Sequence, residues 1–76
     1  MNVKQLRTLR ALLYMSRRQF AEKIGVSFKL VYLMENGQRS ITDATLNKIN
    51  RTFNRQLIEK AKEVATELNE INRKES

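Results

Sequence analysis

The sequence predicts an all-α fold of five helices, of which the last is the longest. Three observations support this prediction. A helix-capping residue flanked by a pair of apolar residues occurs three times, apolar residues recur at spacings of three and four, and proline is absent from the 76 residues. No low-complexity segment interrupts this pattern. A chain of this length forms a single small domain.

The first helix is expected from about Val3 to Leu13. Leu6, Leu9 and Leu13 share one face of this helix, whereas its basic residues lie on other faces. The leucine face is therefore expected to belong to the core.

The second helix is expected from Arg17 to Ile24. Ser16 precedes it and can accept a hydrogen bond from a first-turn amide, while Gln19 can reach back to form a capping box. Met15 and Phe20 flank the cap as an apolar pair. These residues mark a well-defined helix start.

The third helix is expected from Phe28 to about Glu35, after a break of about three residues. Gly25 tolerates the positive φ that ends the second helix, and Ser27 caps the third. Asn36 and Gly37 then provide a left-handed stop. Two short helices joined by a tight turn are typical of a helix-turn-helix unit.

The fourth helix is expected from Asp43 to Phe53, and the fifth begins near Arg55 or Gln56. Thr42 caps the fourth helix, and the carboxylate of Asp43 lies at its positive end. The core face of the fourth helix is expected to consist of Leu46, Ile49 and Phe53.

The net charge of +7 is concentrated in one part of the chain. Residues 1–55 contain eleven Lys and Arg but only three acidic residues. Residues 56–76 contain four Lys and Arg and five acidic residues. This imbalance favours a polyanionic partner, and the basic residues are spread over several short helices rather than along one membrane-binding helix. Double-stranded DNA is the expected partner, and no membrane is expected.

The segments LRALLYMSRRQFAEKIGVS, MENGQRS and ITDATLNKI resemble the lambda-repressor-like, Cro-type helix-turn-helix family of bacterial and phage regulators. The resemblance covers residues 6–53. It implies that the third helix enters the major groove, while the start of the second helix and the loop after the third contact phosphate. The implied phosphate contacts are Arg17, Arg18, Gln38, Arg39 and Ser40.

The third helix is expected to read bases through Phe28, Lys29, Tyr32 and Leu33. Lys29 can donate to guanine, Phe28 and Leu33 can pack on thymine methyl groups, and Tyr32 can reach phosphate or a base edge. Relatives usually carry polar residues at these positions. The apolar side chains therefore leave a second hypothesis open, in which this surface binds a protein partner as an antirepressor or antitoxin-like module would.

Two positions carry structural expectations from the same resemblance. Arg10 is expected to pair with Glu35 and so join the first helix to the third, and a phosphate contact by Arg10 stays open beside this pair. Tyr14 stands where relatives often have glycine, and tyrosine resists positive φ. We therefore expect the first helix to continue further or to close with a different turn.

Residues 1–54 are expected to form the DNA-binding domain, and residues 55–76 an amphipathic helix for dimerisation. Apolar residues of this helix follow a coiled-coil spacing. A homodimer is expected through Val64, Leu68 and Ile71. The alternative is that only the first turns, with Leu57 and Ile58, close the core.

The composition argues against an enzyme. The chain contains no cysteine and no histidine, and it lacks a P-loop and a dinucleotide-binding glycine pattern. No catalytic residue, no metal site and no cofactor is therefore expected. The sequence indicates a cytoplasmic regulator, a repressor of phage, plasmid or bacterial origin that acts by operator occupancy.

Overall fold

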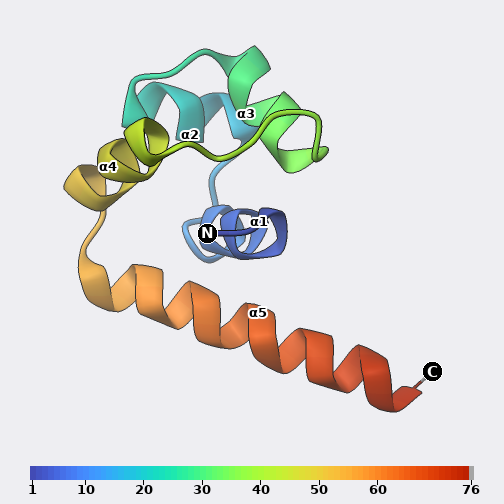
Figure 1. Cartoon of the computed structure of the whole chain (residues 1–76). Helices are drawn as coiled ribbons and strands as arrows, with labels where there is room; N and C mark the ends of the chain where they lie inside the picture. The colour runs from blue at the N-terminus through green and yellow to red at the C-terminus, as the bar shows by residue number, and fades with distance from the viewer. Residues whose placement is uncertain (76) are drawn as a thin grey trace.

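The computed structural model describes the backbone of residues 1–75 and the side chains of residues 1–67. Its described part contains five helices and confirms the all-α prediction. They are α1 (Val3–Leu12), α2 (Arg17–Ile24), α3 (Phe28–Glu35), α4 (Asp43–Thr52) and α5 (Arg55–Glu75). In Figure 1, α1 lies between α5 and the layer that holds α2 and α3, and α4 connects the two sides.

Side chains cap the start of each helix. Ser16 and Gln19 form the expected capping box at α2, and Ser27 and Thr42 cap α3 and α4 as expected. A further capping box, which was not predicted, joins Asn2 to Gln5 at α1. At α5 the Asn54 side chain accepts a hydrogen bond of 2.8 Å from a first-turn amide. Local sequence therefore fixes all five starting points.

Backbone conformation at three positions ends the first three helices. Gly25 and Gly37 have φ of 78° and 75°, which confirms both glycine stops. Tyr14 has a φ of 55°, so the expectation that tyrosine would avoid this conformation is wrong. The amides of Tyr14 and Met15 donate to the carbonyls of Ala11 and Arg10, which close the end of α1 and fix this turn.

The core lies where α1 meets the other helices. Phe20 of α2 stacks on Phe53 at the end of α4, with ring centroids 5.6 Å apart. Leu6 and Leu9 are fully buried, whereas Leu13 is half-buried. The remaining large members of the core are Ile24, Val31, Met34, Ile49 and Ile58.

The fourth helix departs from its predicted core face at one position. Leu46 is half-buried, whereas Thr45 is 6% exposed. Thr45 can be buried because its hydroxyl accepts from that of Thr42, and its amide donates to the same Thr42 oxygen at 3.3 Å. Phe53 is buried as expected but follows α4 as its C-cap.

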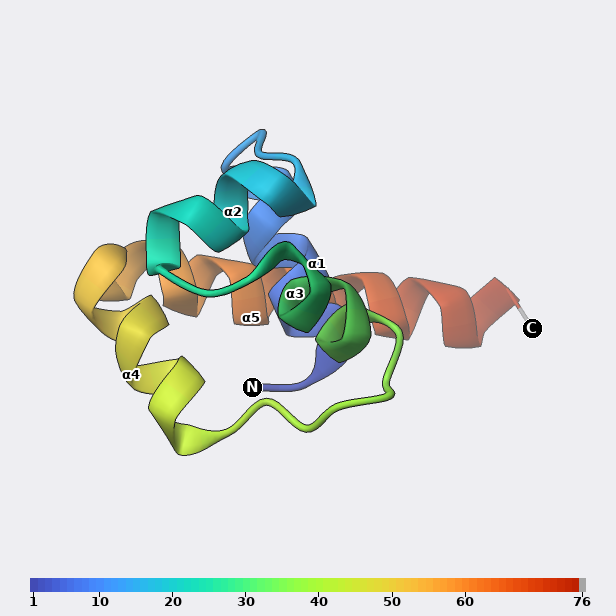
Figure 2. The same cartoon turned by 90° about the horizontal axis from the view of Figure 1, so that it is seen from above.

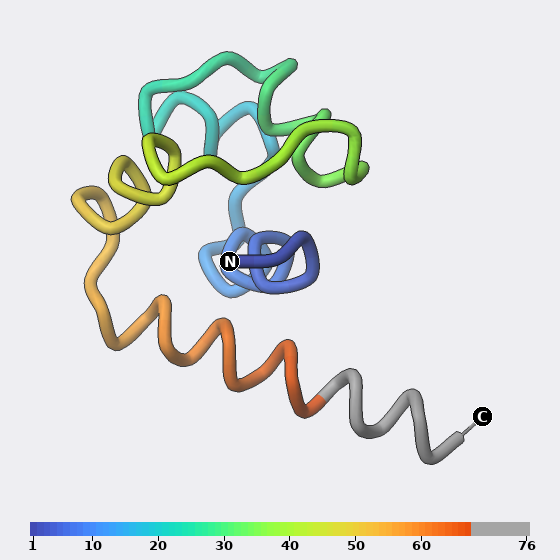
Figure 3. The backbone as a smooth tube through the Cα atoms, viewed as in Figure 1, coloured from blue at the N-terminus to red at the C-terminus, as the bar shows by residue number. Residues whose placement is uncertain are grey.

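The fifth helix shares the core with the rest of the chain. It crosses α1, its most extensive helix partner, which is seen nearly end-on in Figures 1 and 3, and it buries Ile58, Ala61 and Ala65. Val64 is half-buried, and the side chains of Leu68 and Ile71 lie outside the described residues. None of the described helices combines the length and apolar character that a membrane span requires.

Candidate nucleic-acid interface

The turn at residues 25–27 holds α2 and α3 as one unit. The amides of Gly25 and Val26 both donate to the carbonyl of Ala21 at 2.9 Å, which closes the end of α2. Val31 and Met34 then place one face of α3 in the core. Because those positions face inward, the opposite face of α3 lies on the surface of the molecule.

That outward face carries the four residues expected to read bases. Phe28 and Tyr32 are 42% and 43% exposed, Lys29 is exposed, and Leu33 is half-buried. Figure 2 shows that the loop after α3 runs along the outside of the molecule toward α4. This loop, whose Gln38, Arg39 and Ser40 are all exposed, follows directly on the outward-facing helix.

The last residue of α3, Glu35, is fully buried and binds the guanidinium group of Arg10. Both Glu35 oxygens accept from Arg10, Oε2 from Nε at 2.8 Å and Oε1 from Nη2 at 2.9 Å. Arg10 Nη1 also donates to the carbonyl of Met15 at 3.1 Å. The expected pair is therefore bidentate, and it joins α1, α3 and the turn before α2.

Two more arginines approach the same glutamate. Arg17 Nε donates to Glu35 Oε1 at 3.2 Å, and Arg7 Nη2 donates to the Glu35 carbonyl oxygen at 2.7 Å. Arg17 stands at the first position of α2, where the helix dipole disfavours a cation. The carboxylate of Glu35 offsets that cost and holds Arg17 beside α3.

These arginines determine the protonation state of Glu35. Burial alone raises the pKa of the Glu35 carboxyl, but the hydrogen bonds and positive charges of Arg10 and Arg17 together outweigh burial. The pKa of Glu35 therefore lies below its ordinary value of 4.5. The carboxylate stays ionised at neutral pH and keeps both arginines in place.

Two arginines of α2 stack on the aromatic rings of α3. The guanidinium of Arg17 lies 5.6 Å from the ring centroid of Tyr32, and that of Arg18 lies 5.1 Å from that of Phe28. The two rings lie 6.4 Å apart. The start of α2 and the outward face of α3 therefore form one surface, in which positive charge borders aromatic carbon.

Two shallow depressions lie on the outward face of α3. One is lined by Arg17, Phe28, Lys29 and Tyr32, and its surface is almost entirely apolar. The other is lined by Ser27, Lys29, Leu30, Leu33 and Arg39. Lys29 lies between them, with arginines of α2 on one side and Arg39 of the loop on the other. A ligand on this face meets cations at both edges.

A helix-turn-helix family model matches residues 6–60, which is more than half of the chain. The chain belongs to the lambda repressor and Cro-like helix-turn-helix family. No curated protein and no solved structure matches it. The family is one of DNA-binding transcription regulators. In this helix-turn-helix protein, α3 occupies the position of the recognition helix.

The structure brings most of the expected site residues of this helix-turn-helix protein together. Phe28, Lys29 and Tyr32 share one depression with Arg17, whereas Leu33 lies in the other with Arg39. Arg18 borders the first through its stack on Phe28. Arg7 was not among the expected site residues, although its place one turn before Arg10 could have indicated the shared partner.

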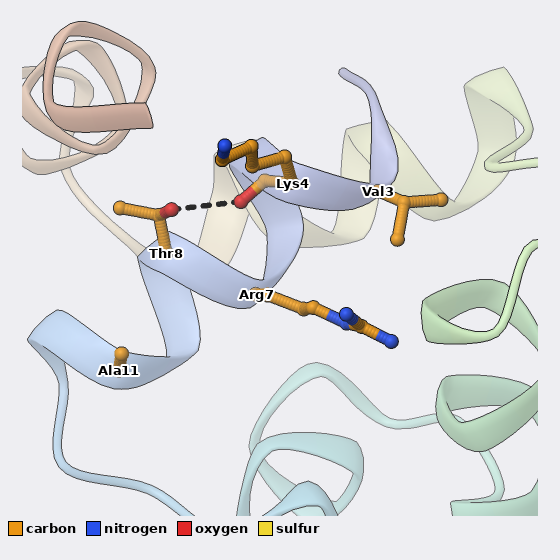
Figure 4. Close-up of a pocket in the computed structure, with 5 residues that line it drawn as sticks. All are labelled: Val3, Lys4, Arg7, Thr8 and Ala11. Atoms are coloured by element: carbon orange, nitrogen blue, oxygen red, sulfur yellow. Dashed lines mark hydrogen bonds between the residues drawn. The ribbon is translucent and has the colours of Figure 1, made fainter. Parts of the chain in front are cut away.

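A further depression of this helix-turn-helix protein lies on α1 and contains none of the expected site residues. Figure 4 shows its lining of Val3, Lys4, Arg7, Thr8 and Ala11. The Thr8 hydroxyl donates to the Lys4 carbonyl at 2.7 Å, and Arg7 extends toward the glutamate that ends α3. Thr8 and Arg7 thus donate hydrogen bonds to backbone carbonyls of the protein itself.

Proposed function

We propose that this protein represses transcription by binding an operator with α3 in the major groove. The observation that carries the proposal is the continuous surface of Arg17, Arg18, Lys29 and Arg39 around the outward face of α3. Four cations within one small face match the phosphates that flank a major groove. The repressor is of phage, plasmid or bacterial origin, in keeping with the family.

Phosphates are bound at two places that flank the recognition helix. Arg17 and Arg18 contact the backbone from the start of α2, and the exposed loop contacts it through Gln38, Arg39 and Ser40. Bases are read by Phe28, Lys29, Tyr32 and Leu33. The ion pair of Arg10 with Glu35 holds α3 at a fixed angle to α1 and so orients these contacts.

The protein acts as a homodimer through the end of α5, with Val64, Leu68 and Ile71 at the contact. The support is the coiled-coil spacing of these residues and the half-burial of Val64 within its own subunit. A dimer sets two recognition helices roughly 34 Å apart, which matches consecutive turns of one face of the duplex.

A second candidate function is supported by the exposed aromatic side chains. Phe28 and Tyr32 leave an apolar patch on α3, and such patches are typical of protein contacts. In this alternative the protein binds a regulatory partner, as an antirepressor or antitoxin-like module does. The cations around the patch favour DNA.

Fluorescence-polarisation binding to a random-sequence duplex pool, at low and at higher salt, tests the proposal. We expect binding that weakens steeply with salt, because released counterions drive phosphate contacts. Sequencing of the retained duplexes is expected to show a two-fold symmetric motif. The Arg17→Ala and Arg18→Ala double variant should bind all duplexes more weakly and with a flatter salt slope, whereas Lys60→Ala on α5 should match the unchanged protein. Absence of binding at low salt would favour a protein partner.

A further inference from the structure

We infer that Phe28 and Tyr32 together form a receptor for the C5-methyl group of thymine, so that each half-site of the operator contains a thymine at this position. The inference rests on the proposed function, because it concerns a duplex bound along α3. It goes further by assigning base preference to one pair of rings and by excluding the neighbouring Leu33 from that role.

The first step is the geometry of the two rings. Phe28 and Tyr32 are four residues apart on α3, so they project from the same face of the helix. Their centroids are 6.4 Å apart and their planes are inclined by 32°. Each of the two residues is more than two-fifths exposed although it lies on a helix packed against the core. Carbon atoms from both rings therefore line one open apolar depression.

The second step is the set of contacts that restrict the two aromatic side chains. Arg18 lies over the Phe28 ring and Arg17 over the Tyr32 ring. Arg17 is itself fixed by its 3.2 Å hydrogen bond to the buried Glu35. These contacts restrict the rings before any ligand arrives, which lowers the entropy lost on binding.

The third step is the chemistry of the ligand. The apolar floor favours a small hydrocarbon group, while Arg17, Arg18 and Lys29 around it favour an anionic surface. Among the four base pairs, only those with thymine present a methyl group in the major groove, and that groove is bordered by phosphates. A thymine methyl group therefore fits the apolar floor of the depression, and the phosphates that border the groove fit the cations at its rim.

Leu33 does not share in this receptor. It is half-buried and lines the other depression with Leu30 and Arg39. Arg39 belongs to the loop after α3, and neither aromatic ring lines this second depression. The methyl contact thus depends on the first turns of α3, where recognition helices of this kind contact base edges.

The test replaces thymine with deoxyuridine, which removes the methyl group and leaves base pairing intact. The probe is a duplex retained from the random-sequence pool, with its thymines replaced one at a time. In each half-site we expect one replacement to weaken binding of the unchanged protein by about threefold to fivefold, the worth of one buried methyl group. Replacement at the remaining thymines should change binding much less.

Protein variants assign that effect to the rings. Phe28→Ala and Tyr32→Ala should bind the thymine and deoxyuridine duplexes nearly equally, whereas Tyr32→Phe and Leu33→Ala should keep the difference. Because Phe28, Tyr32 and Leu33 all lie outside the buried core, circular dichroism melting should show all four variants folded.

Several outcomes would overturn the inference. Equal binding of every deoxyuridine duplex, or an unchanged difference in Phe28→Ala, would show that the rings read no methyl group. Binding of DNA without any enriched motif would reject the receptor and leave DNA binding intact. Failure to bind any duplex at low salt would reject both the receptor and the proposed function.

Discussion

Arg10 and Glu35 form a bidentate ion pair that connects α1 to α3. Their side chains make two parallel hydrogen bonds of 2.8 and 2.9 Å, with the Glu35 side chain fully buried and that of Arg10 22% exposed. The residues are 25 positions apart in the chain. This ion pair fixes the end of α3 against α1, and through Arg17 it also fixes the start of α2.

Arg10→Ala is expected to lower the free energy of unfolding by about 3 kcal/mol, because it leaves a buried carboxylate without its main partner. Urea denaturation followed by circular dichroism measures this change. Arg17→Ala removes a more exposed partner and is expected to cost less than about 1 kcal/mol. Equal losses in the two variants would contradict the central position assigned to Arg10.

Acid is expected to destabilise the protein through Glu35. Because the pKa of Glu35 is lowered in the folded state, its contribution to stability is present above the ordinary value of 4.5 and is lost as pH falls below it. The denaturant concentration at the midpoint of unfolding, measured from pH 7 down to pH 3, should therefore decrease as the solution becomes more acidic. Glu35→Gln is expected to be less stable at pH 7 and to lose less stability as the pH is lowered. A pH dependence of stability parallel to that of the unchanged protein would contradict the assignment to Glu35.

Tyr14→Gly is expected to stabilise the fold by about 0.5 to 1 kcal/mol. Its φ of 55° is costly for a residue with a Cβ, and its side chain is 95% exposed. Gly25→Ala is the matched reverse change. Its new Cβ would meet no atom within 4 Å, so the expected loss of about 1 kcal/mol comes from the backbone alone. Thermal melting measures both changes, and a destabilised Tyr14→Gly would show that the tyrosine side chain stabilises the fold.

Lys29→Ala is expected to weaken binding to the selected duplex more than binding to a random duplex. Lys29 lies between the two depressions of α3, where it can donate to guanine at the centre of the contact. Arg39→Ala is the comparison, because loss of a phosphate contact should weaken both duplexes to a similar extent. Equal effects of Lys29→Ala on the two duplexes would remove its role in base recognition.

Dimerisation is expected to depend on the end of α5. Deleting the whole helix cannot test this, since Ile58 and Ala61 belong to the core. The double substitution of Leu68 and Ile71 by serine instead leaves these residues in place. Analytical ultracentrifugation should show a dimer for the unchanged protein and for the surface variant Thr66→Ser, and a monomer for the double variant. A double variant that still sediments as a dimer would place the contact elsewhere.

Much of the fold could be predicted from the sequence, because helix starts and stops depend on neighbouring residues. The capping box of Ser16 with Gln19 and the positive φ of Gly25 and Gly37 follow from side-chain chemistry within a few positions. Asn2 and Gln5 follow the same rule at the start of α1.

Tyr14 and Thr45 show where local reasoning failed. A tyrosine adopts positive φ when the contacts around the turn outweigh the strain, and Arg10, which donates to the carbonyl of Met15, supplies one such contact. Thr45 replaces Leu46 in the core because its hydroxyl and amide are both satisfied by Thr42. Neither outcome can be found from hydrophobic spacing alone.

The sequence by itself determined five helices, the starts and stops that depend on caps and glycines, and the residues on the outward face of the third helix. Only the tertiary structure decided which of those residues act together. It grouped Phe28 and Tyr32 with the arginines of α2, gave Leu33 to a separate depression, and gathered three arginines around Glu35. These groupings depend on how α1, α2 and α3 pack, and contacts between helices have no fixed spacing in the chain.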